Sequence, residues 1–144
     1  MFGKTKSSPP PAGPPIDPNW ARTPEGRFHR FLPFDPEEHN LSGVSGVYII
    51  WHAGVRPEWV YVGNSRDVAD DLNLLAENDE VMDYEVNGGL FVSWSLVKNE
   101  FQDGVVRFII MNAKPVVENP DAPGEETEAI AVFLPGTEPK KPGH

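Results

Sequence analysis

The chain has 144 residues and carries 22 acidic against 12 basic side chains, for a formal net charge of −10. This charge opposes a general affinity for DNA, RNA or anionic lipid, because such surfaces are bound mainly through Lys and Arg. Cysteine is absent, which excludes disulfides, thiolate nucleophiles and cysteine-based metal sites.

Proline is concentrated near both ends of the sequence. Six of the 16 prolines fall within residues 1–18 and six more from Pro115 onward. Because proline-rich stretches do not build a packed core, we predict four regions. They are a disordered Pro-rich tail (1–18), an arm packed on the domain (19–41), a compact α/β domain (42–119), and an acidic Pro/Gly-rich extension, partly disordered (120–144).

The sequence shows no targeting or membrane signal. No apolar run approaches the roughly 20 residues that a membrane-spanning helix needs. Lys4 and Lys6 are followed by a proline tract, where a signal peptide would carry an apolar segment. We therefore expect a cytoplasmic protein without a membrane partner.

Two β-rich runs, residues 44–51 and 58–63, flank a short loop and predict a hairpin. Apolar side chains alternate onto both faces of these runs, which favours a sheet covered on both sides. In the second run, strict alternation predicts that Val60 and Val62 share one face.

Helical spacing appears after the hairpin. Val68, Leu72 and Leu75 form an apolar stripe, and Asn64 or Ser65 is expected to be the N-cap of this helix. A third strand is predicted over residues 90–97.

Residues 101–113 fit either a helix or a strand. We favour a helix that begins near Gln102 or later and ends before Pro115. Together with the strands, this predicts an α/β (α+β) fold with a small, mainly antiparallel three-stranded sheet flanked by helices.

An acidic segment spans the predicted helix and the residues after it. Residues 67–85 contain eight Asp or Glu and no Lys or Arg. A solvated face is the usual interpretation of such a run, and a basic protein partner is the alternative. We expect a protein partner, and we do not expect nucleic acid.

Gly46-Val47-Tyr48 and Tyr61-Val62-Gly63 resemble the two halves of the GIY-YIG nuclease motif. The order of strand, strand, helix and strand is also similar to that family. Residues 114–119 resemble the Pro-x-x-Asn end of the family domain, with Asn119 one place late and Glu118 at the expected position. The resemblance implies a small sheet flanked by helices, and its active members cut DNA with one divalent metal.

The functional residues implied by the resemblance are only partly present. Tyr48 and Tyr61 match the two motif tyrosines. The position of the helix arginine holds Asp71, and that of the metal-binding glutamate holds Arg107. Glu100 is the nearest upstream acid and a weak candidate metal ligand. Because phosphodiester cleavage needs positive charge where the transition state gathers negative charge, these reversals remove what the chemistry requires.

We therefore predict a catalytically degenerate GIY-YIG-like domain that acts as a binding or structural module without a cofactor. The candidate binding residues surround the start of the first helix: Asn64, Ser65, Arg66, Asp70 and Asp71. We also hypothesise an ion pair between Asp71 and Arg107. One alternative is an active endonuclease that uses Mg²⁺ or Mn²⁺ with displaced residues such as Arg66 and Glu100. The other is an unrelated small α/β domain.

Overall fold

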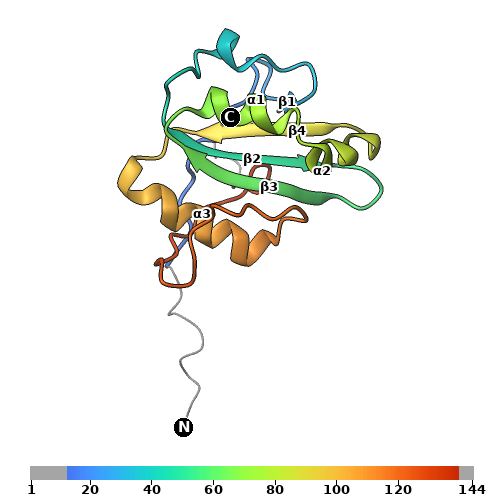
Figure 1. Ribbon diagram of the computed structural model, residues 1–144. Coiled ribbons are helices and arrows are strands. Elements are labelled where there is room, and N and C mark those ends of the chain that lie inside the picture. The colour runs from blue at the N-terminus through green and yellow to red at the C-terminus, as the bar shows by residue number, and fades with distance from the viewer. Residues whose placement is uncertain (1–12, 140–144) are drawn as a thin grey trace.

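The computed structural model describes residues 13–139, which form a four-stranded sheet with helices on both faces (Figure 1). The strands are β1 (His29–Arg30), β2 (Gly46–His52), β3 (Glu58–Ser65) and β4 (Leu90–Ser95). The α-helices are α1 (Val68–Leu75), α2 (Asp79–Met82) and α3 (Asn99–Ala113), and the 3₁₀ helices are η2 (Pro36–His39) and η3 (Asp83–Val86). The predicted α+β fold is confirmed.

The sheet has the order β1-β4-β2-β3, and its neighbouring strands are antiparallel. Its three long strands match the predicted ones, and the two-residue β1 adds a fourth at one edge. At the opposite edge, residues after α3 cover β3: the backbone N–H groups of Val116 and Val117 donate to the carbonyls of Trp59 and Val60 at 3.0 and 2.9 Å. This pairing protects an edge strand that would otherwise offer free backbone groups.

A β-bulge in β3 changes the predicted alternation. Ile50 pairs with Tyr61 while Trp51 pairs with Trp59, so Val60 is an extra residue in β3. Val60 and Tyr61 therefore both pack on the α1 side, and Val62 packs on the α3 side. The predicted common face for Val60 and Val62 is wrong for this reason.

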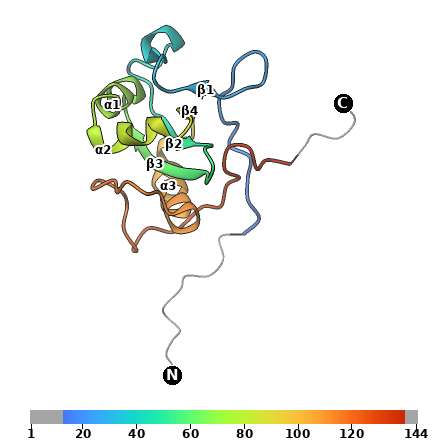
Figure 2. The same cartoon turned by 90° about the vertical axis from the view of Figure 1, so that its right-hand side faces the viewer.

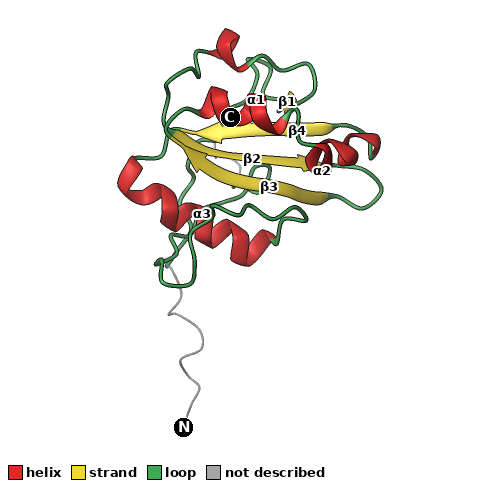
Figure 3. Cartoon of the chain, viewed as in Figure 1, coloured by secondary structure: helices red, strands yellow, loops and turns green. Residues whose placement is uncertain are grey.

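Helices cover both faces of the sheet (Figure 3), and an apolar core lies beneath them on each face. Figure 2 shows α1 and α2 on one side and α3 on the other. The first core joins Tyr48, Ile50 and Tyr61 to the buried stripe of α1. The second joins Val47, Ile49 and Val62 to α3, and Trp20 and Val132 complete it. The predicted covering on both sides is confirmed.

The start of α1 differs from the prediction. Its N-cap is Asp67, whose side chain accepts from the backbone N–H of Asp70 at 3.1 Å. Asn64 and Ser65 still belong to β3, because Ser65 pairs with Gly46 at the start of β2. The strand thus continues two residues past Gly63, and the helix begins correspondingly later.

Residues 101–113 form the predicted helix, which begins earlier than expected. The helix α3 starts at Asn99, after Lys98, and ends at Ala113, where Lys114 adopts a left-handed conformation with φ of 50°. Pro115 then prevents continuation. The preceding strand β4 stops at Ser95, two residues short of its predicted end.

Segments from both ends of the described chain pack side by side. Ile16 forms a parallel bridge with Val132, and the Trp20 indole N–H donates to the carbonyl of Phe133 at 2.6 Å. Of the predicted Pro-rich tail, residues 1–12 lie outside the described residues, as do residues 140–144 of the extension. Between residues 13 and 139, no helix has the length and apolar character to cross a bilayer.

Candidate functional site

Tyr48 and Tyr61 lie on neighbouring strands and present their rings to the same face of the sheet. The ring centroids are 6.3 Å apart and the planes differ by 6°. Tyr48 is 2% and Tyr61 8% exposed, under the cover of α1. The two tyrosines singled out in the sequence therefore form one stacked, buried pair.

Asp71 connects this pair to α1. The Tyr48 hydroxyl donates to Oδ2 of Asp71 at 2.7 Å, and the Ser65 hydroxyl donates to Oδ1 at 2.9 Å. Ser65 Oγ in turn accepts from the backbone N–H of Asp67 at 2.9 Å. Each carboxylate oxygen of Asp71 thus accepts a hydrogen bond from one hydroxyl group. The turn that leads into α1 places Asp71 next to Tyr48.

Gly63 and Asn119 complete the surroundings of Tyr48. Tyr48 pairs across the ladder with Gly63, where a Cβ atom would lie 2.6 Å from the tyrosine hydroxyl oxygen. The Asn119 side-chain amide donates to the carbonyl of Val62 at 3.1 Å. Asn119, and not Glu118, is therefore the residue that bonds to β3. It does so although it stands one position later in the sequence than the asparagine that the resemblance predicts.

Asp121 is a site residue that sequence reasoning missed. Its backbone N–H donates to Asn119 Oδ1 at 2.9 Å, which closes a turn at residues 119–121. Its charge contributes to the raised pKa of both Tyr48 and Tyr61. The Asn-Pro-Asp sequence of residues 119–121 is typical of such a turn and is the one signal that marks it.

The electrostatics of the site keep both tyrosines neutral. Burial, then the hydrogen bond to Asp71 and its charge, raise the pKa of Tyr48 far above its ordinary value. Burial, followed by the charges of Asp71 and Asp121, raises the pKa of Tyr61 to about 12. Neither tyrosine can supply a phenolate near neutral pH, and the charged groups that act on them are anions.

The other predicted site residues lie apart from the tyrosine pair or turn away from it. Asn64 donates to the side chains of Asp103 at 3.1 Å and Gln102 at 3.3 Å, on the α3 side. Arg66 and Asp70 are exposed, and so is Glu100 in the first turn of α3.

The hypothesised ion pair between Asp71 and Arg107 is wrong. Asp71 binds two hydroxyls on the α1 side, whereas Arg107 belongs to α3 on the other side of the sheet. Within residues 13–139, the ion pair is Arg22–Glu138, and His52 Nε2 lies 2.8 Å from Glu58 Oε1. The same stretch contains no group of three or more His, Cys, Asp or Glu residues that would hold a metal ion.

Comparison of the chain with family models, with curated proteins and with solved structures finds no match.

The raised tyrosine pKa values predict a loss of stability in alkali. A folded-state pKa above the ordinary 10.0 means that the folded protein holds these protons more tightly than the unfolded chain. The resulting stabilisation is complete below pH 10 and is lost as the pH rises through about 12 for Tyr61. We expect the urea midpoint to fall steeply above pH 10, and less steeply in Tyr61→Phe. Equal slopes for the two proteins would contradict the role of Tyr61.

Proposed function

We propose that this chain is a GIY-YIG-like domain without cleavage activity that serves as a binding or structural module. The observation that carries the proposal is the carboxylate of Asp71, hydrogen-bonded to Tyr48 at 2.7 Å. By the resemblance, this position on the first helix would hold an arginine. An anion occupies the place of the required cation.

Physical chemistry supports the loss of activity. Negative charge accumulates on the phosphoryl oxygens in the transition state, and a fixed carboxylate repels it. The raised pKa of Tyr61, about 12, also keeps its hydroxyl from acting as a base at neutral pH. The tyrosines are thus explained as packing residues that fix the hairpin against α1.

The acidic surface of α1, α2 and η3 supports a basic protein partner. Its acids form no ion pair with any residue between 13 and 139. The clearly exposed ones are Asp70, Glu77, Asp79, Glu80 and Asp83. A partner rich in Lys and Arg would gain electrostatic complementarity there, chiefly in association rate and specificity.

A plasmid-nicking assay tests the loss of activity. We expect no cleavage of supercoiled DNA with Mg²⁺ or Mn²⁺, and little retention of DNA even at low salt. Metal-dependent nicking that disappears in Tyr61→Phe or Glu100→Gln would establish the nuclease alternative and overturn the proposal.

Charge removal on α1, on α2 and in the turn between them is expected to weaken binding to a basic peptide. The triple variant Asp70→Asn, Glu77→Gln, Asp79→Asn should lose about tenfold or more in affinity for a fluorescent octalysine peptide, measured by anisotropy at low ionic strength. Each exposed substitution should change the free energy of unfolding by about 0.5 kcal/mol or less.

A matched control separates local from overall charge. The triple variant Glu25→Gln, Glu125→Gln, Glu126→Gln removes the same charge from exposed positions outside α1 and α2. It should retain most of the peptide affinity. An equal loss of peptide affinity in both triple variants would show that net charge alone attracts the peptide. It would count against a specific binding site on the acidic surface of α1, α2 and η3.

A further inference from the structure

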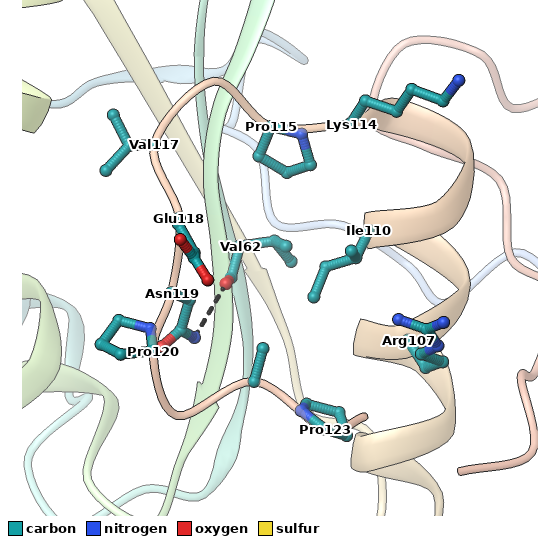
Figure 4. Close-up of a pocket in the computed structure, with 11 residues that line it drawn as sticks. Val62, Arg107, Ile110, Lys114, Pro115, Val117, Glu118, Asn119, Pro120 and Pro123 are labelled. Atoms are coloured by element: carbon teal, nitrogen blue, oxygen red, sulfur yellow. Dashed lines mark hydrogen bonds between the residues drawn. The ribbon is translucent and has the colours of Figure 1, made fainter. Parts of the chain in front are cut away.

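A cavity of about 450 Å³ lies between the second half of α3 and the loop of residues 115–123 (Figure 4). It adjoins the tyrosine–aspartate site through Asn119, which borders both, and it lies on the α3 side of the sheet, where Val62 packs. Much of its lining is apolar, including Ile110, Val117 and three prolines. Such a lining favours a ligand with a small apolar body.

Oppositely charged side chains line the two walls of this cavity. Arg107 and Lys114 come from α3 and its C-terminal cap, and Glu118 comes from the loop (Figure 4). Arg107 is half-buried, yet its guanidinium forms no ion pair with Glu118 and no hydrogen bond to the residues between 13 and 139. In Figure 4 the Lys114 side chain extends away from the loop, which leaves Arg107 as the main cation beside the cavity.

The loop wall is held in place before any ligand arrives. Val116 and Val117 pair with β3 through backbone hydrogen bonds of 3.0 and 2.9 Å. Asn119 adds the 3.1 Å bond to the carbonyl of Val62, and Ala122 donates to the carbonyl of Asn119 at 3.1 Å. A wall fixed in this way costs little ordering entropy when a ligand binds.

We propose that this cavity binds an apolar amino-acid carboxylate, either as a free amino acid or as the C-terminal residue of a peptide. The planar guanidinium of Arg107 suits a carboxylate, which it contacts through two parallel N–H groups. Glu118 on the facing wall accepts from the ligand's ammonium or amide N–H, and the side chain packs against Val62 and Ile110. A phosphate dianion fits less well, because Glu118 and the overall charge of −10 both repel it.

Three leucine derivatives test the site by chemical shift changes in ¹⁵N-labelled protein. N-acetyl-L-leucine represents the peptide terminus, L-leucine the free amino acid, and N-acetyl-L-leucinamide lacks the carboxylate. For ligands of this size we expect a Kd on the order of 1 mM for at least one of the two acids. The amide should bind about tenfold or more weakly, because it cannot form the charged hydrogen bonds to Arg107.

Variants assign the binding to the two walls. Arg107→Gln should weaken the acids about tenfold or more, and Arg56→Gln, an exposed arginine of the hairpin loop, should leave binding unchanged. Glu118→Gln should weaken L-leucine more than N-acetyl-L-leucine if the free amino acid is the ligand, and both to a similar small extent if the peptide terminus is. The proposal is overturned if neither acid shifts the resonances of residues 107–123, if the amide binds as well as the acids, or if Arg107→Gln binds like the wild type. These outcomes do not affect the proposal that the acidic surface of α1, α2 and η3 binds a basic partner. That surface is tested with a different peptide and different variants.

Discussion

Replacing Gly63 with alanine is expected to lower the free energy of unfolding by about 2–3 kcal/mol. The added Cβ would lie 2.6 Å from the hydroxyl oxygen of Tyr48 and 2.9 Å from the Asn119 amide nitrogen. The tyrosine cannot easily move, because it is 2% exposed and its hydroxyl is bonded to Asp71. Urea unfolding, followed by circular dichroism, measures the change.

Gly124→Ala is the matched control for this substitution. The nearest atom to a Cβ at Gly124 is the flexible carboxylate end of Glu126, at 2.7 Å, which can move aside. Its cost should be about 0.5 kcal/mol or less. Tyr48→Phe should recover part of the loss in the Gly63→Ala background, since it removes the closest contact. A Gly63→Ala protein as stable as the wild type would show that the tyrosine ring is not held over Gly63.

This packing gives the two glycine–tyrosine tripeptides a structural reason. A Cβ at Gly46 would lie 2.8 Å from the carbonyl oxygen of Ser95 and against Val68 of α1, while Gly63 admits the ring of Tyr48. Both glycines thus allow neighbouring chain segments to approach closely. This packing explains both glycines without any catalytic role. The two tripeptides are thus explained by the packing of the hairpin against β4, α1 and the ring of Tyr48.

The sequence pattern predicted those parts of the fold that depend on neighbouring residues alone. Alternation placed Val47 and Ile49 opposite Tyr48, because β2 pairs regularly with both neighbours. It failed at Val60, since a bulge depends on how the partner strand is paired. It also failed at the cap of α1, where several polar residues in a row were suitable and the pairing of Ser65 with Gly46 decided the outcome.

The site depends on contacts that sequence spacing does not encode. Asp71 was located by its place on the helix, but its bonds to Tyr48 and Ser65 arise from the packing of α1 onto the sheet. Asn119 and Asp121 reach the site through a turn far along the chain. Arg107 was expected beside Asp71, but α3 packs on the other face of the sheet and places the arginine at the cavity between α3 and residues 115–123.

Removing the side chain of Asp71 is expected to lower the free energy of unfolding by about 2 kcal/mol in Asp71→Ala. The Tyr48 hydroxyl would remain buried without its acceptor, and such an unsatisfied group costs about 1–3 kcal/mol. The neighbouring exposed variant Asp70→Ala should cost only about 0.5 kcal/mol. In the Tyr48→Phe background the cost of Asp71→Ala should shrink by about 1 kcal/mol, because the group that needs the carboxylate is gone.

The tyrosine pKa values provide an independent measure of the same interaction. Burial is the largest cause of the raised pKa of Tyr48 and Tyr61, and the charge of Asp71 adds to it. Asp71→Ala should therefore lower the pKa of Tyr61 part of the way from about 12 toward 10.0. Absorbance at alkaline pH follows phenolate formation, and Asp70→Ala should titrate like the wild type. Additive costs in the Tyr48→Phe cycle together with an unmoved Tyr61 pKa would mean that Asp71 does not control this pair. A coupled loss with a lowered pKa would identify Asp71 as the residue that both stabilises the tyrosine site and raises the pKa of its tyrosines.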